Sequence, residues 1–150
     1  MNGNSEKFEV LKMLYPIFKQ EVFDRRGAMM KITSFGAAIL LGLLLLASSR
    51  VLSFGHKGVS RWLVILGVVI FTAGLIYQIQ QHKARRTQAK QGLIAIESAL
   101  QVFQEDAYVP GKSLYPLDWQ SVPGKDWSVA ISILSLVGLT VLVILALVFV

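Results

Sequence analysis

Cysteine is absent from this sequence, and histidine occurs only twice, at His56 and His82. Without cysteine there can be no disulfide, no thiolate metal site and no cysteine nucleophile. The two histidines lie far apart, and no HExxH, GxSxG, Walker or GxGxxG pattern occurs. We therefore expect no enzymatic activity, no cofactor and no metal site.

Charge is missing from three long apolar stretches, Ile32–Ser49, Trp62–Gln81 and Trp127–Val150. A membrane-spanning helix needs about 20 apolar residues. The whole chain is 54% hydrophobic and 16% charged, whereas soluble domains are roughly 25% charged. The three stretches predict an all-α integral membrane protein with three transmembrane helices. Because they contain no aspartate, glutamate, lysine, arginine or histidine, they argue against a pump, a proton-coupled transporter or a voltage sensor.

Lysine and arginine are distributed unevenly among the segments that flank these stretches. Six precede the first stretch and six lie in residues 82–126, whereas three lie in residues 50–61. The positive-inside rule therefore places the N-terminus in the cytoplasm and the C-terminus outside. We expect a multi-pass protein of the bacterial inner membrane.

A cluster of basic residues follows the second stretch. We interpret it as a topology determinant and as a contact for anionic lipid headgroups. The alternative is recognition of a nucleotide or nucleic acid, but no glycine-rich loop or stacking platform accompanies the cluster. We expect membrane lipids as partners, no nucleic acid, and no identified small-molecule substrate. The cluster comprises Lys83, Arg85, Arg86 and Lys90.

Apolar residues recur in alternating steps of three and four in two arms, one before the first stretch and one after the second. This heptad spacing predicts helices with an apolar stripe. Because a short loop joins the first two spans, their extensions would be antiparallel neighbours and pair as a cytoplasmic helical hairpin. The predicted arm seam comprises Phe8, Leu11, Tyr15, Phe18, Val22, Ala89, Leu93, Ile96, Leu100 and Phe103.

Two questions about the arms stay open in the sequence. Each arm can instead lie flat on the membrane as an amphipathic helix. Pro16 adds a second question, because a proline inside a helix removes a hydrogen bond and costs about 3 kcal/mol. Either the N-terminal arm kinks at Pro16, or a short helix over residues 5–14 ends there and Pro16 opens the next helix.

The linker over residues 105–126 contains the tetrapeptide VPGK twice, at Val109–Lys112 and Val122–Lys125. Proline followed by glycine suits the centre of a type II turn. A disordered linker would be poor in aromatic residues, so we expect this one to be ordered. It would act either as a lid that returns the chain to the membrane or as a docking surface for a partner or ligand. The predicted docking surface comprises Tyr108, Tyr115, Trp119 and Trp127.

Small residues recur at helix-packing spacing inside the three apolar stretches. Such stripes let helices approach closely, within one chain or between chains. The candidate packing residues are Ser34, Ala38, Gly42, Gly67, Gly74, Ser128, Ser132 and Ser135.

The predicted organisation has seven segments in order along the chain. They are an N-terminal arm (1–31), a first span (32–50), an outer loop (51–61), a second span (62–81), a helical extension (82–104), the linker (105–126) and a third span (127–150). We expect a non-enzymatic scaffold or accessory subunit of a membrane complex, either homo-oligomeric or bound to other membrane-protein subunits.

The alternative is a homo-oligomeric pore-forming or membrane-disrupting effector. Two spans with cytoplasmic helical arms are similar in layout to small prokaryotic effector modules proposed to form pores, although the third span departs from that layout. A pore would need a polar lining, and the spans offer few candidates for it. These are Thr72, Ser132, Ser135 and Thr140.

Overall fold

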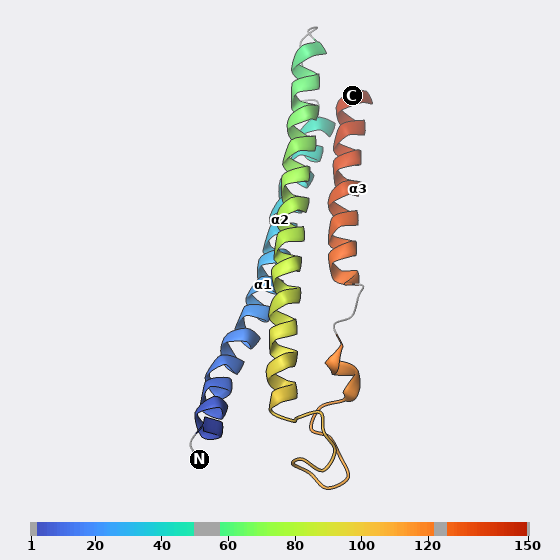
Figure 1. The fold of residues 1–150 in the computed structure, drawn as a ribbon. Helices are drawn as coiled ribbons and strands as arrows, with labels where there is room; N and C mark the ends of the chain where they lie inside the picture. The colour runs from blue at the N-terminus through green and yellow to red at the C-terminus, as the bar shows by residue number, and fades with distance from the viewer. Residues whose placement is uncertain (1–2, 50–57, 122–125, 150) are drawn as a thin grey trace. The chain divides into compact units, whose positions relative to one another are not determined.

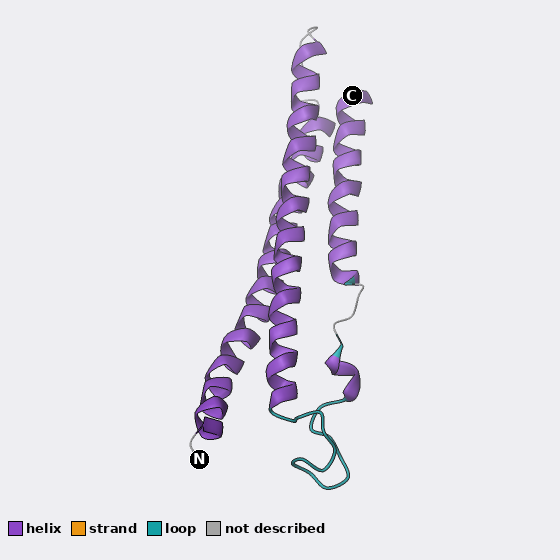
Figure 2. Ribbon diagram, viewed as in Figure 1, coloured by secondary structure: helices purple, strands orange, loops and turns teal. Residues whose placement is uncertain are grey.

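A computed structural model describes residues 3–49, 58–121 and 126–149 (Figure 1). It contains three long helices and a short 3₁₀ helix, and across the described residues the regular structure is helical (Figure 2). Each long helix includes a window long and apolar enough to cross a membrane. The predicted all-helical class and the three apolar helices are confirmed. The elements are α1 (Gly3–Ser48), α2 (Gly58–Ala99), η1 (Leu117–Gln120) and α3 (Trp127–Phe149).

The chain divides into two compact units, which we call unit 1 and unit 2. Unit 1 comprises Met1–Gly27 and Lys83–Lys125, and unit 2 comprises Ala28–His82 and Asp126–Val150. Most of the predicted outer loop and the second VPGK turn lie outside the described residues.

Unit 2 has one apolar core to which α1, α2 and α3 all contribute. Its fully buried side chains are Leu40 from α1, Ile79 from α2, and Leu136 and Val143 from α3. The buried positions of α3 recur at intervals of three, four or seven residues, so they form one stripe along the helix. Unit 2 is therefore held together mainly by the packing of apolar side chains.

A polar contact joins α2 and α3 inside this core. The hydroxyl oxygens of Thr72 and Thr140 lie 2.7 Å apart, and each hydroxyl is also 2.9 Å from a carbonyl of its own helix, that of Val68 or Leu136. Such bonds satisfy buried hydroxyl groups and add about 0.6 kcal/mol on average to helix association in membranes.

The helices of unit 2 approach one another closely at Gly36, which was not among the predicted packing residues. A Cβ built on Gly36 would overlap the side chain of Leu75 and lie 3.2 Å from Cδ2 of Leu136. The predicted glycines, by contrast, have open space where a Cβ would stand, and most of the other predicted packing residues are exposed. Within unit 2 the predicted stripes therefore do not mark the helix contacts.

Helix α1 continues through Pro16 without interruption. The alternative of a separate short helix over residues 5–14 is therefore wrong. The lost hydrogen bond costs about 3 kcal/mol, while Tyr15 and Phe18, on either side of Pro16 in sequence, contact α2 and stabilise the helix there.

Helix α2 ends at Ala99, short of the predicted end at residue 104. Gln101 has a φ of 58°, the amide of Gln101 donates to the carbonyl of Ser98, and the amide of Val102 donates to that of Glu97. These two bonds form a Schellman motif, which normally has glycine at the left-handed position. Because glutamine occupies that position here, no glycine marks the end of the helix in the sequence.

The start of α2 is tied to the end of α3 by Arg61. Its Nη1 donates to the carbonyl of Val148 at 3.2 Å. The last carbonyls of a helix have no partner within the helix, and α3 has no basic residue in its own last turn. Arg61 therefore supplies a positive donor where the helix dipole favours one.

Candidate functional site

Unit 1 contains a pocket of about 460 Å³ between α1, α2 and the linker. This volume falls within the range of about 300–1,000 Å³ that is usual for sites of small molecules. We call it the unit 1 pocket. Its lining residues are Tyr15, Lys19, Val22 and Phe23 from α1, Lys90, Leu93, Ile94 and Glu97 from α2, and Tyr115, Asp118, Trp119 and Ser121 from the linker.

The predicted seam residues lie on the more buried sides of the two arms, with the exception of Phe8, which is exposed. Ala89, Ile96 and Phe103 are buried, although Phe103 lies in the turn after α2 rather than in the helix. The remaining seam residues are half-buried. They are Leu11, Tyr15, Phe18, Val22, Leu93 and Leu100.

Phe18 and Gly92 form a close contact between the two arms. A Cβ built on Gly92 would lie 2.6 Å from Cε1 of the Phe18 ring. Since real Cβ atoms do not come so close to a ring carbon, α1 can approach α2 here because residue 92 has no side chain.

A chain of hydroxyl and carboxyl groups crosses the wall of the pocket. The Tyr15 hydroxyl donates to Oε1 of Glu97 at 3.4 Å and lies 3.1 Å from the Tyr115 hydroxyl. Glu97 is 8% exposed. Burial raises the pKa of its carboxyl, while the bond from Tyr15 and the charge of Lys19 act in the opposite direction.

The pKa of the Tyr15 hydroxyl is shifted as well. Its pKa is raised, first by the hydrogen bond with Tyr115 and second by burial. Tyr15 is therefore a neutral donor at physiological pH, and it links all three elements of unit 1.

The linker is built around the ring of Tyr115. The centroid of this ring lies 6.0 Å from that of Phe103 and 5.4 Å from that of Trp119. The backbone amide of Tyr115 donates to the carbonyl of Val102. Tilted and edge-to-face rings at these distances attract one another. These contacts place Tyr115 and Trp119, two of the predicted docking residues, at the pocket.

The other two predicted docking residues lie elsewhere. The hydroxyl of Tyr108 donates to the carbonyl of Leu100 at the end of α2, and Trp127 begins α3 in unit 2. The first VPGK segment forms a turn in which Gly111 has a φ of 71° and the Lys112 amide donates to the carbonyl of Val109.

Of the predicted basic cluster, Lys90 lines the pocket, whereas Lys83, Arg85 and Arg86 do not. Lys19, which the sequence analysis did not single out, has its Nζ 5.6 Å from the centroid of the Tyr15 ring. At this distance an ammonium group and an aromatic ring attract each other.

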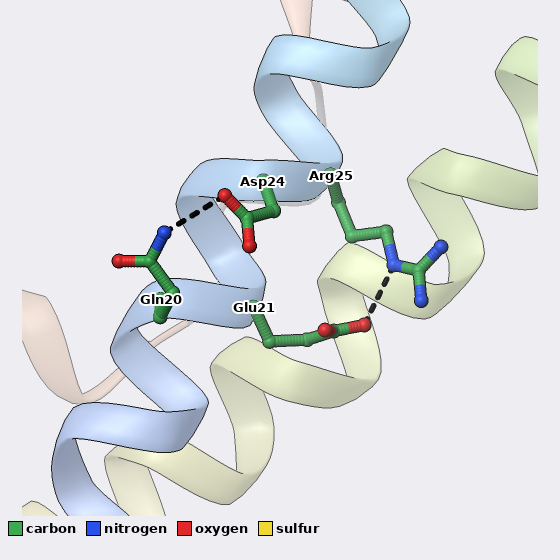
Figure 3. A network of polar contacts seen from close by, with 4 residues as sticks. All are labelled: Gln20, Glu21, Asp24 and Arg25. Atoms are coloured by element: carbon green, nitrogen blue, oxygen red, sulfur yellow. Dashed lines mark hydrogen bonds and ion pairs between the residues drawn. The ribbon is translucent and has the colours of Figure 1, made fainter.

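Polar contacts along α1 lie next to the pocket but do not belong to its lining. Gln20 donates to Asp24, and Arg25 is paired with Glu21 (Figure 3); Nε of Arg25 lies 2.6 Å from Oε1 of Glu21. Pairs of this kind, four residues apart on a helix, contribute about 0.2–0.5 kcal/mol each. They support α1 locally.

Glu97 is the site residue that the sequence analysis missed most clearly. It is the one charged residue between Lys90 and Glu105, in the middle of an apolar heptad run. Its position as a lone carboxylate in an apolar run could have marked it as a site residue, because a buried carboxylate needs a hydrogen-bonding or charged partner.

Across the described residues, no group of three or more histidine, aspartate or glutamate side chains is placed to hold a metal ion. Comparison with protein-family models, with curated proteins and with solved structures gives no match to this chain.

Proposed function

We propose that this chain is a non-enzymatic, multi-pass membrane protein that acts as a scaffold or accessory subunit of a membrane complex. The observation that supports it most directly is an exposed apolar stripe on α1. Val10, Met13, Leu14 and Ile17 lie on one face of the helix, and Met13 and Ile17 are 69% and 63% exposed.

This stripe lies outside the three apolar stretches and on a different face of α1 from the seam. Exposed apolar patches of this kind mark sites of association. Residues spaced at i, i+3, i+4 and i+7 are those by which an amphipathic helix enters the groove of a partner. The stripe therefore favours a protein partner that covers the N-terminal arm.

Unit 2 offers a second surface for association. Ser34, Ala38, Gly67 and Gly74 are exposed. Small residues on exposed helix faces let a neighbouring membrane helix approach closely. We propose that these faces pack against other subunits or against further copies of this chain.

The proposed location is the bacterial inner membrane, with the N-terminus and the two arms in the cytoplasm. The uneven distribution of lysine and arginine supports this orientation. In it, Lys83, Arg85 and Arg86 would follow the second span directly, where cytoplasmic basic residues contact anionic lipids.

Purification from the native host in mild detergent tests the proposal. A scaffold subunit should co-elute with defined proteins in a fixed ratio. The double variant Met13→Gln with Ile17→Gln should lose that partner, and the control Lys7→Gln with Lys12→Gln should keep it. A chain that elutes alone, or a partner retained by both variants, would contradict the proposed role of the stripe.

The pore-forming alternative makes a different prediction, namely dye release from vesicles that contain the chain alone. Two of its few candidate lining residues, Thr72 and Thr140, are buried and bonded to each other. This arrangement favours the scaffold over the pore, and the dye-release assay separates the two.

A further inference from the structure

We propose that the unit 1 pocket binds a small organic anion with an apolar or aromatic body, whose charge lies between Lys19 and Lys90. Such binding is independent of the scaffold function, because it requires neither a protein partner nor a particular membrane orientation.

The body of the ligand would lie on apolar and aromatic side chains contributed by all three elements of the pocket. Phe23 from α1, Ile94 from α2 and Trp119 from the linker line it together. Phe23 and Trp119 are both more than half exposed. Covering such surface stabilises a complex because it removes apolar area from water.

The charges of the lining favour an anion. Lys19 and Lys90 come from facing helices, and within the described part of the chain neither forms an ion pair. Glu97, the acid buried beside them, accepts the Tyr15 hydroxyl, and burial disfavours its ionised form. Asp118 is the other acid of the lining and lies on η1. Two ammonium groups therefore face two acids, and because burial disfavours the ionised form of Glu97, the lining carries an excess of positive charge whenever Glu97 holds its proton.

A carboxylate or a phosphate on an apolar body has the required chemistry. Such an anion can be free in water, or it can be the headgroup of an anionic lipid. Either kind of anion would bind the same two lysines. The two cases differ in whether an anionic lipid competes with a soluble anion for the site.

Isothermal titration of the full chain in phosphatidylcholine nanodiscs, with empty nanodiscs subtracted, tests the proposal. The probes are 2-naphthoate, 2-naphthylmethylammonium and 2-naphthalenemethanol, which share one ring system and differ in charge. We expect saturable binding of the naphthoate and at least tenfold weaker binding of the other two.

The variants separate the pocket from the general charge of the protein. Lys19→Gln with Lys90→Gln should weaken naphthoate binding at least tenfold. The control Lys12→Gln with Lys112→Gln removes the same charge outside the pocket and should leave the affinity within about twofold. Ile94→Trp should abolish binding by filling the pocket, with the helical circular dichroism unchanged.

Three results would overturn the proposal. They are no saturable binding to a chain of normal helical content, equal or tighter binding of the ammonium probe, and unchanged affinity in the Lys19→Gln, Lys90→Gln variant. If soluble dihexanoyl phosphatidylglycerol displaces naphthoate and dihexanoyl phosphatidylcholine does not, the site is supported and its ligand is a lipid headgroup. If neither lipid displaces naphthoate, and naphthoate binding still depends on Lys19 and Lys90, the site is supported and its ligand is a soluble anion.

Discussion

The ring of Phe18 on α1 lies where a side chain on residue 92 of α2 would stand, with Cε1 2.6 Å from a Cβ built on Gly92. The two residues are far apart in sequence and belong to the same compact unit. Glycine weakens an isolated helix by about 1 kcal/mol relative to alanine. The contact with Phe18 explains why a glycine nevertheless stands at residue 92, inside α2.

Gly92→Ala should therefore destabilise unit 1. Overpacking costs about 1–3 kcal/mol and the gain in helix propensity is about 1 kcal/mol, which leaves a net loss of up to about 2 kcal/mol. Urea unfolding followed by the fluorescence of Trp119, in a Trp62→Phe, Trp127→Phe background, measures this unit. Gly27→Ala is the control, because open space surrounds its Cβ position, and it should be neutral or stabilising. Equal stabilisation by both variants would contradict the contact.

The pairing of the arms can be tested by disulfide crosslinking, because the chain has no cysteine of its own. Phe18→Cys with Leu93→Cys joins two half-buried seam positions and should crosslink within one chain under mild oxidation. Phe18→Cys with Gln91→Cys uses an exposed position and should crosslink poorly. Crosslinks found only between chains would mean that the arms pair across an oligomer. Failure of both pairs would favour arms that lie flat on the membrane.

The raised pKa of Glu97 gives a pH dependence of defined sign. The folded chain keeps the Glu97 proton to a higher pH than the unfolded chain does. Between the unfolded and folded pKa values the folded state binds more protons, so the free energy of unfolding falls as pH rises. The stabilisation is fully present below the unfolded pKa and is lost through the folded one.

Glu97→Gln should remove this fall in the free energy of unfolding, while the glutamine oxygen still accepts a hydrogen bond from Tyr15. Above the folded pKa the variant should be at least as stable as the wild type in the Trp119 unfolding assay. Glu105→Gln, a change at an exposed carboxylate, should leave the pH profile unaltered. A pH profile that is the same in the wild type and in Glu97→Gln would show that the carboxyl of Glu97 does not cause the fall.

The left-handed conformation of Gln101 predicts a stabilising substitution. For residues other than glycine this conformation costs about 1–2 kcal/mol, so Gln101→Gly should raise the free energy of unfolding by about 1 kcal/mol. Gln91→Gly lies inside α2 and should instead lower it by roughly 0.5–1 kcal/mol. Loss of stability in both variants would argue against the Schellman motif.

The proposed orientation predicts that reporters fused after Gln104 and after Val150 lie on opposite sides of the membrane. The third apolar stretch separates these two positions, and its length suffices for one crossing. An alkaline phosphatase and a fluorescent protein fused at each site report the outer and the cytoplasmic side. Reporters on the same side would contradict a membrane-spanning third helix.

The sequence by itself determined the helical class and the buried sides of the arms. Three uncharged stretches of about 20 residues can satisfy their backbone groups in a membrane only as helices or closed barrels, and the local 3–4 repeat indicated where Ala89, Leu93 and Ile96 would be shielded. These properties follow from the geometry of neighbouring residues along one helix, so they can be read without knowing what the helix touches.

Only the tertiary structure decided which residues meet across the chain. In unit 2 the helices approach closely at Gly36, whereas Ser34 and Ala38, which the spacing predicted as packing residues, are exposed. The tertiary structure also brought Tyr15 to Glu97 and Tyr115, which lie 82 and 100 residues away. Periodicity gives the face of a helix but not the partner of that face, because the partner depends on side-chain volumes and hydrogen bonds contributed by distant parts of the chain.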